Sequence, residues 1–249
     1  MIAHRGAAAE APENTMPAFA LGLEQGADGL ELDVRRTADG ELVVIHDATL
    51  DRTTDGRGRV AELTFREVRG ADAGTSSVHG ARATREPTPV PALHEVFERY
   101  PEVEITVDVK DVAATADVVA LIRDFGRLAR TILYVEEGTR RRAFREYPGR
   151  RATSTRQAVR LAGRRRWVRD PGDRSVPEVI HTPLRHGDLP IVTPEYVARA
   201  HDAGRTIQVW TINDPPEMSR LAGWEVDGII TDEVRAAVAR LRSGARDVA

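Results

Sequence analysis

The sequence predicts an α/β protein with the fold of a TIM (β/α)8 barrel. Short apolar runs rich in β-branched residues alternate with longer amphipathic stretches, which is the pattern of βαβ units and a parallel sheet. Eight strand-like runs occur within 249 residues, and this number and length are typical of a (β/α)8 barrel. A doubly wound open sheet is the alternative that the pattern leaves open.

The predicted strands are distributed along the whole chain. Each is short and apolar, as expected for strands that are covered on both faces in a parallel sheet. In order, they are Met1–His4, Gly29–Val34, Glu104–Lys110, Thr131–Val135, Ala152–Ser154, Glu178–Thr182, Thr206–Thr211 and Gly228–Thr231.

Amphipathic stretches between these runs predict helices. The clearest are Thr15–Gln25, Ala92–Tyr100, Ala113–Leu128, Pro194–Ala203 and Glu233–Leu241. Asn14 is the predicted N-cap of the first helix, which has Pro17 in its first turn and Gly26 as its stop. Thr193 followed by Pro194 has the pattern of an N-cap before the first helical position.

Residues 37–91 interrupt the alternation. The turn dipeptide Asp39-Gly40 precedes the apolar run 41–46, which predicts a hairpin strand that returns along the second strand. The rest is rich in Gly, Asp, Thr and Arg, and predicts an irregular insertion over one end of the sheet. We therefore expect a single domain over residues 1–249 with a small insertion at about 37–91.

Composition excludes several classes of function. The chain has 36 Lys+Arg and 39 Asp+Glu, a formal charge of −3, which argues against a strongly basic nucleic-acid binder. It has no cysteine, so disulfides, thiolate nucleophiles and zinc–sulfur sites are excluded. It shows neither a signal-peptide pattern nor an apolar run of about 18 residues. We expect a cytoplasmic protein without a transmembrane segment, and its oligomeric state is left open.

Acidic side chains alternate with apolar ones in two neighbouring predicted strands. Because residues two apart share a face, Glu31 and Asp33 lie together, and Asp108 of the next strand points to the same interior. Carboxylates this close repel one another unless a positive charge lies between them, and a hard divalent cation such as Ca²⁺ or Mg²⁺ is the simplest candidate. For Glu31 and Asp33, a solvated edge strand is the alternative.

Basic and imidazole side chains lie near the predicted strand ends that form the mouth of a barrel. Lys110 is the only lysine of the chain, and a compact ammonium beside the acids suits an anion. Arg5 can hold a phosphate through two parallel hydrogen bonds. His4 and His46 end strands that enter the same mouth, and imidazole exchanges protons near neutral pH. An ion pair between Lys110 and Asp108 without a function is the competing interpretation of the lysine.

The sequence gives less specific predictions for the roles of three further side chains. Trp210 either walls a ligand at the mouth or packs in the core, and the sequence favours neither. Asp232 is predicted to be a helix N-cap rather than a catalytic acid. His181 ends a strand, and it is the least settled of the five histidines that we treat as ordinary surface or core residues.

Several motifs, in this order, resemble the glycerophosphodiester phosphodiesterase family over nearly the whole chain. They are His4-Arg5-Gly6, Pro12-Glu13-Asn14-Thr15, Glu31-Leu32-Asp33, His46-Asp47 with Thr49-Leu50-Asp51-Arg52-Thr53-Thr54, Val107-Asp108-Val109-Lys110, Val209-Trp210-Thr211-Ile212-Asn213 and Asp227-Gly228-Ile229-Ile230-Thr231-Asp232. The region between about Thr131 and Leu189 contributes little to the match. The resemblance implies a TIM barrel with a small insertion after the second strand.

The resemblance also implies the roles of the site residues. Glu31, Asp33 and Asp108 would bind one divalent ion, and His4 and His46 would be the acid–base pair. Arg5 and Lys110 would hold the phosphate, while Trp210 would line the pocket. The family usually has Glu where this chain has Asp108, so the carboxylate is kept on a side chain that is one methylene shorter.

The implied activity is metal-dependent hydrolysis of glycerophosphodiesters to glycerol 3-phosphate and an alcohol. One histidine would deprotonate the attacking oxygen and the other would protonate the leaving alcohol. The attacker is either water or a hydroxyl of the substrate's own glycerol, and the sequence does not assign the two histidines to the two roles. The alternatives are a lysophospholipase D-like activity, which the polar insertion disfavours, and a catalytically silent barrel that binds a phosphorylated ligand.

Overall fold

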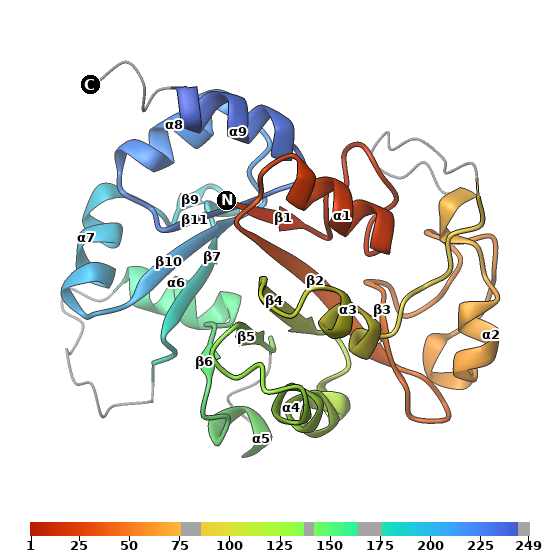
Figure 1. The fold of residues 1–249 in the computed structure, drawn as a ribbon. Coiled ribbons are helices and arrows are strands. Elements are labelled where there is room, and N and C mark those ends of the chain that lie inside the picture. Colours follow the sequence, from red (N-terminus) through yellow and green to blue (C-terminus); the bar gives the residue numbers. More distant parts are fainter. Residues whose placement is uncertain (76–85, 137–141, 164–175, 244–249) are drawn as a thin grey trace.

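Parallel strands arranged in a ring form the centre of the molecule (Figure 1). The computed structural model describes residues 1–75, 86–136, 142–163 and 176–243. In these residues the parallel strands pair in the order β6-β5-β4-β2-β1-β11-β10-β7, and a parallel bridge between Ala152 and Val179 joins the two ends. Because the first and last strands meet, the sheet is a nearly closed barrel. The predicted TIM barrel is confirmed over the alternative of an open sheet.

The eight barrel strands follow the predicted runs closely. They are β1 (Ile2–His4), β2 (Gly29–Arg36), β4 (Glu104–Val109), β5 (Thr131–Tyr134), β6 (Arg150–Arg151), β7 (Val179–Pro183), β10 (Thr206–Trp210) and β11 (Gly228–Thr231). The prediction was wrong for the fifth strand, which lies at Arg150–Arg151 rather than at 152–154. Ser154 instead caps the next helix, because its side chain accepts a hydrogen bond from the backbone N–H of Gln157.

Helices surround the barrel and cover its outer face (Figure 1). They are α1 (Met16–Glu24), α3 (Leu93–Arg99), α4 (Thr115–Asp124), α5 (Arg142–Arg145), α6 (Thr155–Ala162), α7 (Pro194–Asp202), α8 (Pro215–Gly223) and α9 (Val234–Ser243), with a 3-10 turn η4 (Val112–Ala114) before α4. The five predicted helices are present, while α5, α6 and α8 were not among them. Thr193 caps α7 as predicted, since its side chain accepts from the backbone N–H of Tyr196.

The start of α1 differs from the prediction. Thr15, not Asn14, is the N-cap, and its side chain accepts a hydrogen bond from the N–H of Ala18. Asn14 lies one residue outside the helix with φ of 59° and binds Asp33 of β2. Gly26 follows the helix with φ of 100°, a left-handed conformation that suits a glycine at a helix end, as predicted.

The segment between β2 and α3 has a small core of its own. Its first strand, β3 (Leu42–Val44), pairs antiparallel with β2, so the predicted hairpin is confirmed. The prediction of an otherwise irregular segment was too simple, because η1 (Val60–Glu62), α2 (Phe65–Arg69) and η2 (Ala73–Thr75) follow. Residues 76–85 of the predicted insertion lie outside the described residues. The division of the chain into one domain stays a prediction.

The alternation of side chains along β2 and β4 determines what faces the barrel interior. Leu30, Leu32 and Val34 of β2, like Val107 and Val109 of β4, belong to the apolar core. Period-two alternation places Glu31, Asp33 and Asp108 on the opposite face. The barrel therefore has an apolar layer toward the helices and acidic groups toward its interior.

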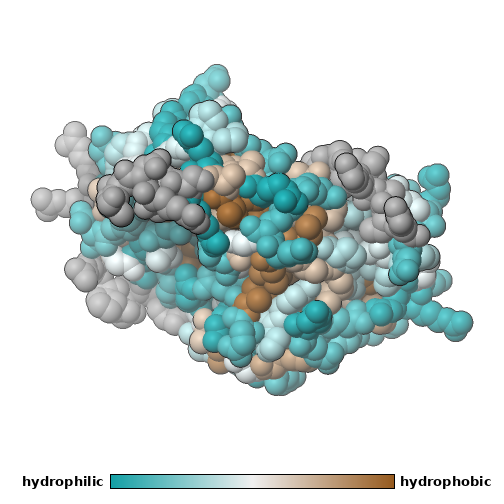
Figure 2. Space-filling view, turned by 45° about the horizontal axis from the view of Figure 1, so that its top comes forward, coloured by the Kyte–Doolittle hydropathy of each residue, from teal (hydrophilic) through white to brown (hydrophobic). Residues whose placement is uncertain are grey.

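The surface is mainly polar on the face shown in Figure 2, with apolar patches near its centre. Within the described ranges, no helix has the length and apolar character needed to cross a bilayer. The cytoplasmic location expected from the sequence stays a prediction.

Candidate active site

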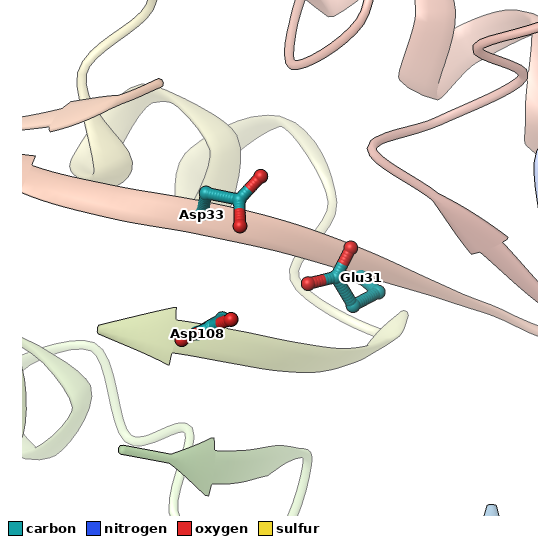
Figure 3. A group of neighbouring side chains, drawn as sticks. All are labelled: Glu31, Asp33 and Asp108. Carbon is teal, nitrogen blue, oxygen red and sulfur yellow. The ribbon is translucent and has the colours of Figure 1, made fainter. Parts of the chain in front are cut away.

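Three carboxylates from two adjacent strands converge inside the barrel (Figure 3). Asp33 of β2 lies in register with Asp108 of β4, and Glu31 is two residues earlier on β2. Each of the three offers one oxygen, and these oxygens all lie within 4.8 Å of one another. All three residues are buried. The structure thus brings together the acids that the sequence placed on one face.

The cluster has more negative charge than its surroundings compensate. Burial, together with the charge of Asp33, raises the pKa of Glu31 to about 7. Burial also raises the pKa of Asp108 to about 7, although Lys110 opposes the shift. Asp33 behaves differently: burial alone would raise its pKa, but Arg5 and Lys110 hold it well below its usual range. In the described part of the chain, the cationic groups near Glu31 and Asp108 do not offset the effect of burial on the pKa of either carboxylate.

Lys110 lies between two of these acids. Its Nζ donates a hydrogen bond to Asp108 Oδ2 at 2.6 Å and lies 3.0 Å from Asp33 Oδ1. Glu31 has no comparable contact with an ammonium group in the described part of the chain. Three buried carboxylates beside one ammonium form an oxygen-rich donor set, which fits a hard divalent cation.

His4 is held by a carboxylate that the sequence assigned differently. Its Nδ1 lies 2.7 Å from Asp232 Oδ1, and its Nε2 lies 3.9 Å from Glu31 Oε2. Asn213 Nδ2 donates to Asp232 Oδ2 at 2.7 Å and fixes that carboxylate in turn. The helix α9 begins at Val234, so Glu233 rather than the predicted Asp232 stands at the position of its N-cap. Glu233 N donates a hydrogen bond to Thr231 Oγ1 at 3.0 Å.

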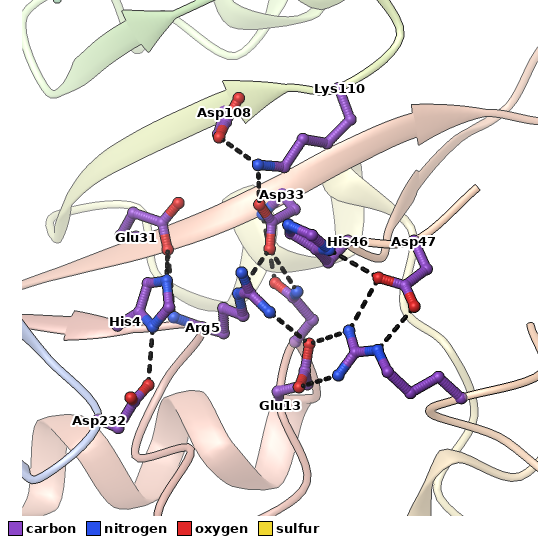
Figure 4. Close-up of polar contacts among 12 residues, drawn as sticks. His4, Arg5, Glu13, Glu31, Asp33, His46, Asp47, Asp108, Lys110 and Asp232 are labelled. Carbon is purple, nitrogen blue, oxygen red and sulfur yellow. Dashed lines mark hydrogen bonds and ion pairs between the residues drawn. The ribbon is translucent and has the colours of Figure 1, made fainter. Parts of the chain in front are cut away.

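His46 has the same arrangement on the other side of the acids. It follows β3, and its Nδ1 lies 2.7 Å from Asp47 Oδ1. In each case a carboxylate on Nδ1 favours a proton on that nitrogen and leaves Nε2 for a reacting group. Burial lowers the pKa of His46, whereas the bond to Asp232 raises that of His4 against the effect of burial. Figure 4 shows both pairs at the same site as Glu31 and Asp33.

Arg5 joins the acid cluster to a second carboxylate. Its Nε lies 3.0 Å from Asp33 Oδ2, and its Nη1 donates to Glu13 Oε1 at 2.8 Å. The turn that presents it needs left-handed backbone at Arg5 and Gly6, with φ of 53° and 85°. A Cβ on Gly6 would lie 2.5 Å from the backbone carbon of Ala18, so only glycine fits there.

An aromatic wall of Tyr134, His181 and Trp210 continues the lining of the barrel from the acids, since Tyr134 of β5 lies in register with Asp108 of β4. His181 of β7 has its ring centroid 4.7 Å from that of Tyr134 and 5.7 Å from that of Trp210. Burial lowers the pKa of His181 to about 3, so this ring is neutral at physiological pH. Trp210 lines the cavity rather than packing only in the core, and His181 is part of the same wall.

These groups border one cavity of about 400 Å³. The residues that line it are His4, Arg5, Glu31, Asp33, His46, Asp108, Val109, Lys110, Val112, Tyr134, Glu136, His181, Trp210, Thr211 and Ile230. All eight site residues chosen from the sequence are among them. The sequence did not predict the contacts of Glu13, Asn14, Asp47, Asn213 and Asp232 with the site residues. Each lies within a quoted motif, so membership of the motif was the available signal.

Comparison with known proteins identifies the family. The model of the glycerophosphoryl diester phosphodiesterase family matches residues 4–236. The chain belongs to this family. Membership of this family confirms the enzyme class expected from the motifs, a phosphoric diester hydrolase.

Individual members of the family align with nearly the whole chain. A glycerophosphodiester phosphodiesterase of Caldanaerobacter subterraneus is 32% identical over 257 aligned residues, covering 98% of each chain. The crystal structure of a glycerophosphodiester phosphodiesterase from Agrobacterium tumefaciens has a TM-score of 0.78 and 29% identity, and covers 96% of this chain and 98% of its own. That of a Thermotoga maritima glycerophosphodiester phosphodiesterase has a TM-score of 0.71 and 27% identity, with 96% coverage of both.

Proposed function

We propose that this chain hydrolyses glycerophosphodiesters to glycerol 3-phosphate and an alcohol, with a divalent cation and two histidines as proton carriers. One observation carries the proposal: three carboxylates and two carboxylate-held histidines border the same cavity. The family membership of the chain supports the substrate class.

In this proposal, Glu31, Asp33 and Asp108 hold one Ca²⁺ or Mg²⁺ ion, whose positive charge stabilises charge on the phosphoryl oxygens. Arg5 and Lys110 add donors beside the same carboxylates, so a phosphate bound there meets fixed positive groups on more than one side. Donors that are already in position stabilise the charge of the transition state without reorganisation.

The two histidines provide the proton transfers. One Nε2 accepts the proton of the attacking oxygen, and the other donates a proton to the leaving alcohol. Asp232 and Asp47 hold the two rings, so each presents the same nitrogen to the cavity. The aromatic wall of Tyr134, His181 and Trp210 would accommodate the alcohol portion of the substrate.

The competing activities have less support. A lysophospholipase D-like enzyme needs an apolar rim for an acyl chain, and Leu189 is the only large, strongly exposed apolar side chain among the described residues. A silent barrel would be favoured if Asp108 were too short to join the cluster, yet its carboxylate lies with those of Glu31 and Asp33.

Incubation of the purified chain with glycerophosphocholine tests the proposal directly. We expect release of glycerol phosphate that stops with a chelator and returns when Mg²⁺ or Ca²⁺ is added in excess. Binding of the substrate without release of product, under any of these conditions, would favour the silent barrel.

A further inference from the structure

A single guanidinium group connects the segment between β2 and α3 to two parts of the proposed active site. Arg52 Nε and Nη2 donate to Asp47 Oδ2 and Oδ1 at 2.6 and 2.9 Å. Its Nη1 and Nη2 donate to Glu13 Oε2 and Oε1 at 2.8 and 2.9 Å. Both contacts are bidentate, and such pairs fix the relative orientation of two planar groups. The position of Arg52 therefore sets the planes of both carboxylates.

The first carboxylate leads to His46. Asp47 Oδ1 is shared between Arg52 Nη2 and His46 Nδ1, at 2.9 and 2.7 Å. Without its guanidinium partner, the partly exposed carboxylate of Asp47 could rotate or turn toward water, and the imidazole would lose the partner that selects its tautomer.

The second carboxylate leads to Arg5. Glu13 is buried, and its Oε1 accepts from both Arg5 Nη1 and Arg52 Nη2, at 2.8 and 2.9 Å. Burial alone would raise the pKa of Glu13, but the two arginines hold it below its usual range, so this carboxylate is ionised between two cations. Arg5 in turn lies 3.0 Å from Asp33.

Arg52 is not among the residues that line the cavity. The backbone on both sides of Arg52 is held by the rest of the segment. Leu50 is buried in the apolar core of the segment, and Thr54 donates to the carbonyl of Leu50 through both N–H and Oγ1. This turn presents the guanidinium toward the barrel.

We propose that Arg52 is a positioning residue for the reaction, which orients His46 through Asp47 and Arg5 through Glu13. This inference rests on the proposed function and deepens it. It assigns to the segment between β2 and α3 a role in assembling the site, since one side chain from that segment fixes a candidate proton carrier and a candidate phosphate ligand together.

Kinetics of Arg52→Gln provide the first test. We expect kcat to fall about 10- to 100-fold with a smaller change in KM, because loss of orientation affects the reacting geometry more than binding. Arg59→Gln is the matched control, since Arg59 lies in the same segment and, among the described residues, its side chain forms an ion pair with the exposed Glu62 at 3.3 Å. Should Arg52→Gln not fold, Arg52→Lys takes its place: it keeps the charge but cannot bind both carboxylates bidentately, and at least a tenfold loss of kcat is expected.

Imidazole nitrogen NMR provides a test that does not depend on activity. In the wild-type protein, neutral His46 should carry its proton on Nδ1, and in Arg52→Gln it should become a mixture of tautomers, with the resonances assigned by their loss in His46→Gln. An unchanged tautomer together with unchanged kcat in Arg52→Gln overturns the inference. If the wild-type protein lacks phosphodiesterase activity, the proposed function fails, while the tautomer still decides whether Arg52 orients His46.

Discussion

At the scale of single residues, the two histidines are built alike although they come from distant parts of the chain. Each has a carboxylate on Nδ1, provided by the residue after β11 for His4 and by the next residue in sequence for His46. The duplication is expected when one reaction needs two proton transfers, because each ring must keep a defined tautomer. A purely structural histidine would need only one satisfied contact and no access to the cavity.

Replacing His46 with alanine should abolish turnover and leave the fold intact. An acid–base group contributes about 10²- to 10⁴-fold to a rate, and the side chain of His46 is 34% exposed, so its removal leaves no large cavity in the core. The comparison is with His94→Ala, which removes a similarly exposed ring that lies 3.2 Å from Glu41 and does not line the cavity. Turnover near the wild-type level by a folded His46→Ala protein would refute the assignment.

Asp108 should control the affinity for the metal. Asp108→Asn removes one of the three charges of the cluster, and we expect the metal concentration for half-maximal activity to rise by about tenfold or more. Asp108→Glu keeps the charge and should retain activation at wild-type metal concentrations. Asp124→Asn, an exposed change on α4, serves as the control. Equal activation of all three variants by titrated metal would remove Asp108 from the proposed ligand set.

At the scale of elements, the turn between β1 and α1 is the most constrained connection of the site. Gly6→Ala places a methyl group within 2.5–2.7 Å of Ala18 and forces φ of 85° on an alanine. We expect a loss of unfolding free energy of about 3 kcal/mol, together with lower activity, since His4 and Arg5 precede the turn.

Gly187→Ala separates the cost of a positive φ from the cost of contact with Ala18. Gly187 also has a positive φ, 58°, but nothing lies within 4 Å of the added methyl group. Its change should cost only about 1 kcal/mol. Denaturant unfolding measures both variants, and equal losses would show that contact with Ala18 is unimportant.

Elements with a strong local signal could be predicted from the sequence, and those fixed by distant contacts could not. The Thr193-Pro194 start of α7 and the β2–β3 hairpin depend on neighbouring residues and were found. Asn14 was mistaken for a cap because its actual partner, Asp33, lies 19 residues away. Similarly, Asp232 follows a strand and precedes a helix, as caps do, but the pairing of β11 with β1 brings it to His4.

At the scale of the whole molecule, closure of the barrel brings side chains from distant parts of the sequence together around one cavity. Alternation along β2 and β4 was sufficient to place the three acids on one face, because residues two apart in a strand point to the same side of the sheet. The aromatic wall was not predicted as a unit, because Tyr134 of β5 meets His181 and Trp210 of β7 and β10 only when the two ends of the sheet close. His181 was therefore left among the ordinary histidines.

Closure also concentrates negative charge in the interior, which makes the stability of the metal-free protein depend on pH. The pKa values of Glu31 and Asp108, about 7, exceed those of about 4 expected in an unfolded chain. Between pH 4 and 7, roughly, the metal-free native state therefore binds more protons than the unfolded state, and the free energy of unfolding contributed by these groups decreases as pH rises. Asp33, with its lowered pKa, acts in the opposite direction but only at lower pH.

A divalent ion should reverse this loss, because it binds the ionised carboxylates and so competes with protons. At a metal concentration about 100-fold above Kd, binding adds about 2.7 kcal/mol, which corresponds to a rise in Tm of roughly 5–10 °C for a chain of this size. We expect this rise at pH 7.5 and a much smaller one at pH 5, measured by thermal unfolding with metal or with chelator. In Asp108→Asn the rise at pH 7.5 should shrink. A rise of equal size at both pH values would show that the ion binds somewhere other than the carboxylates of β2 and β4.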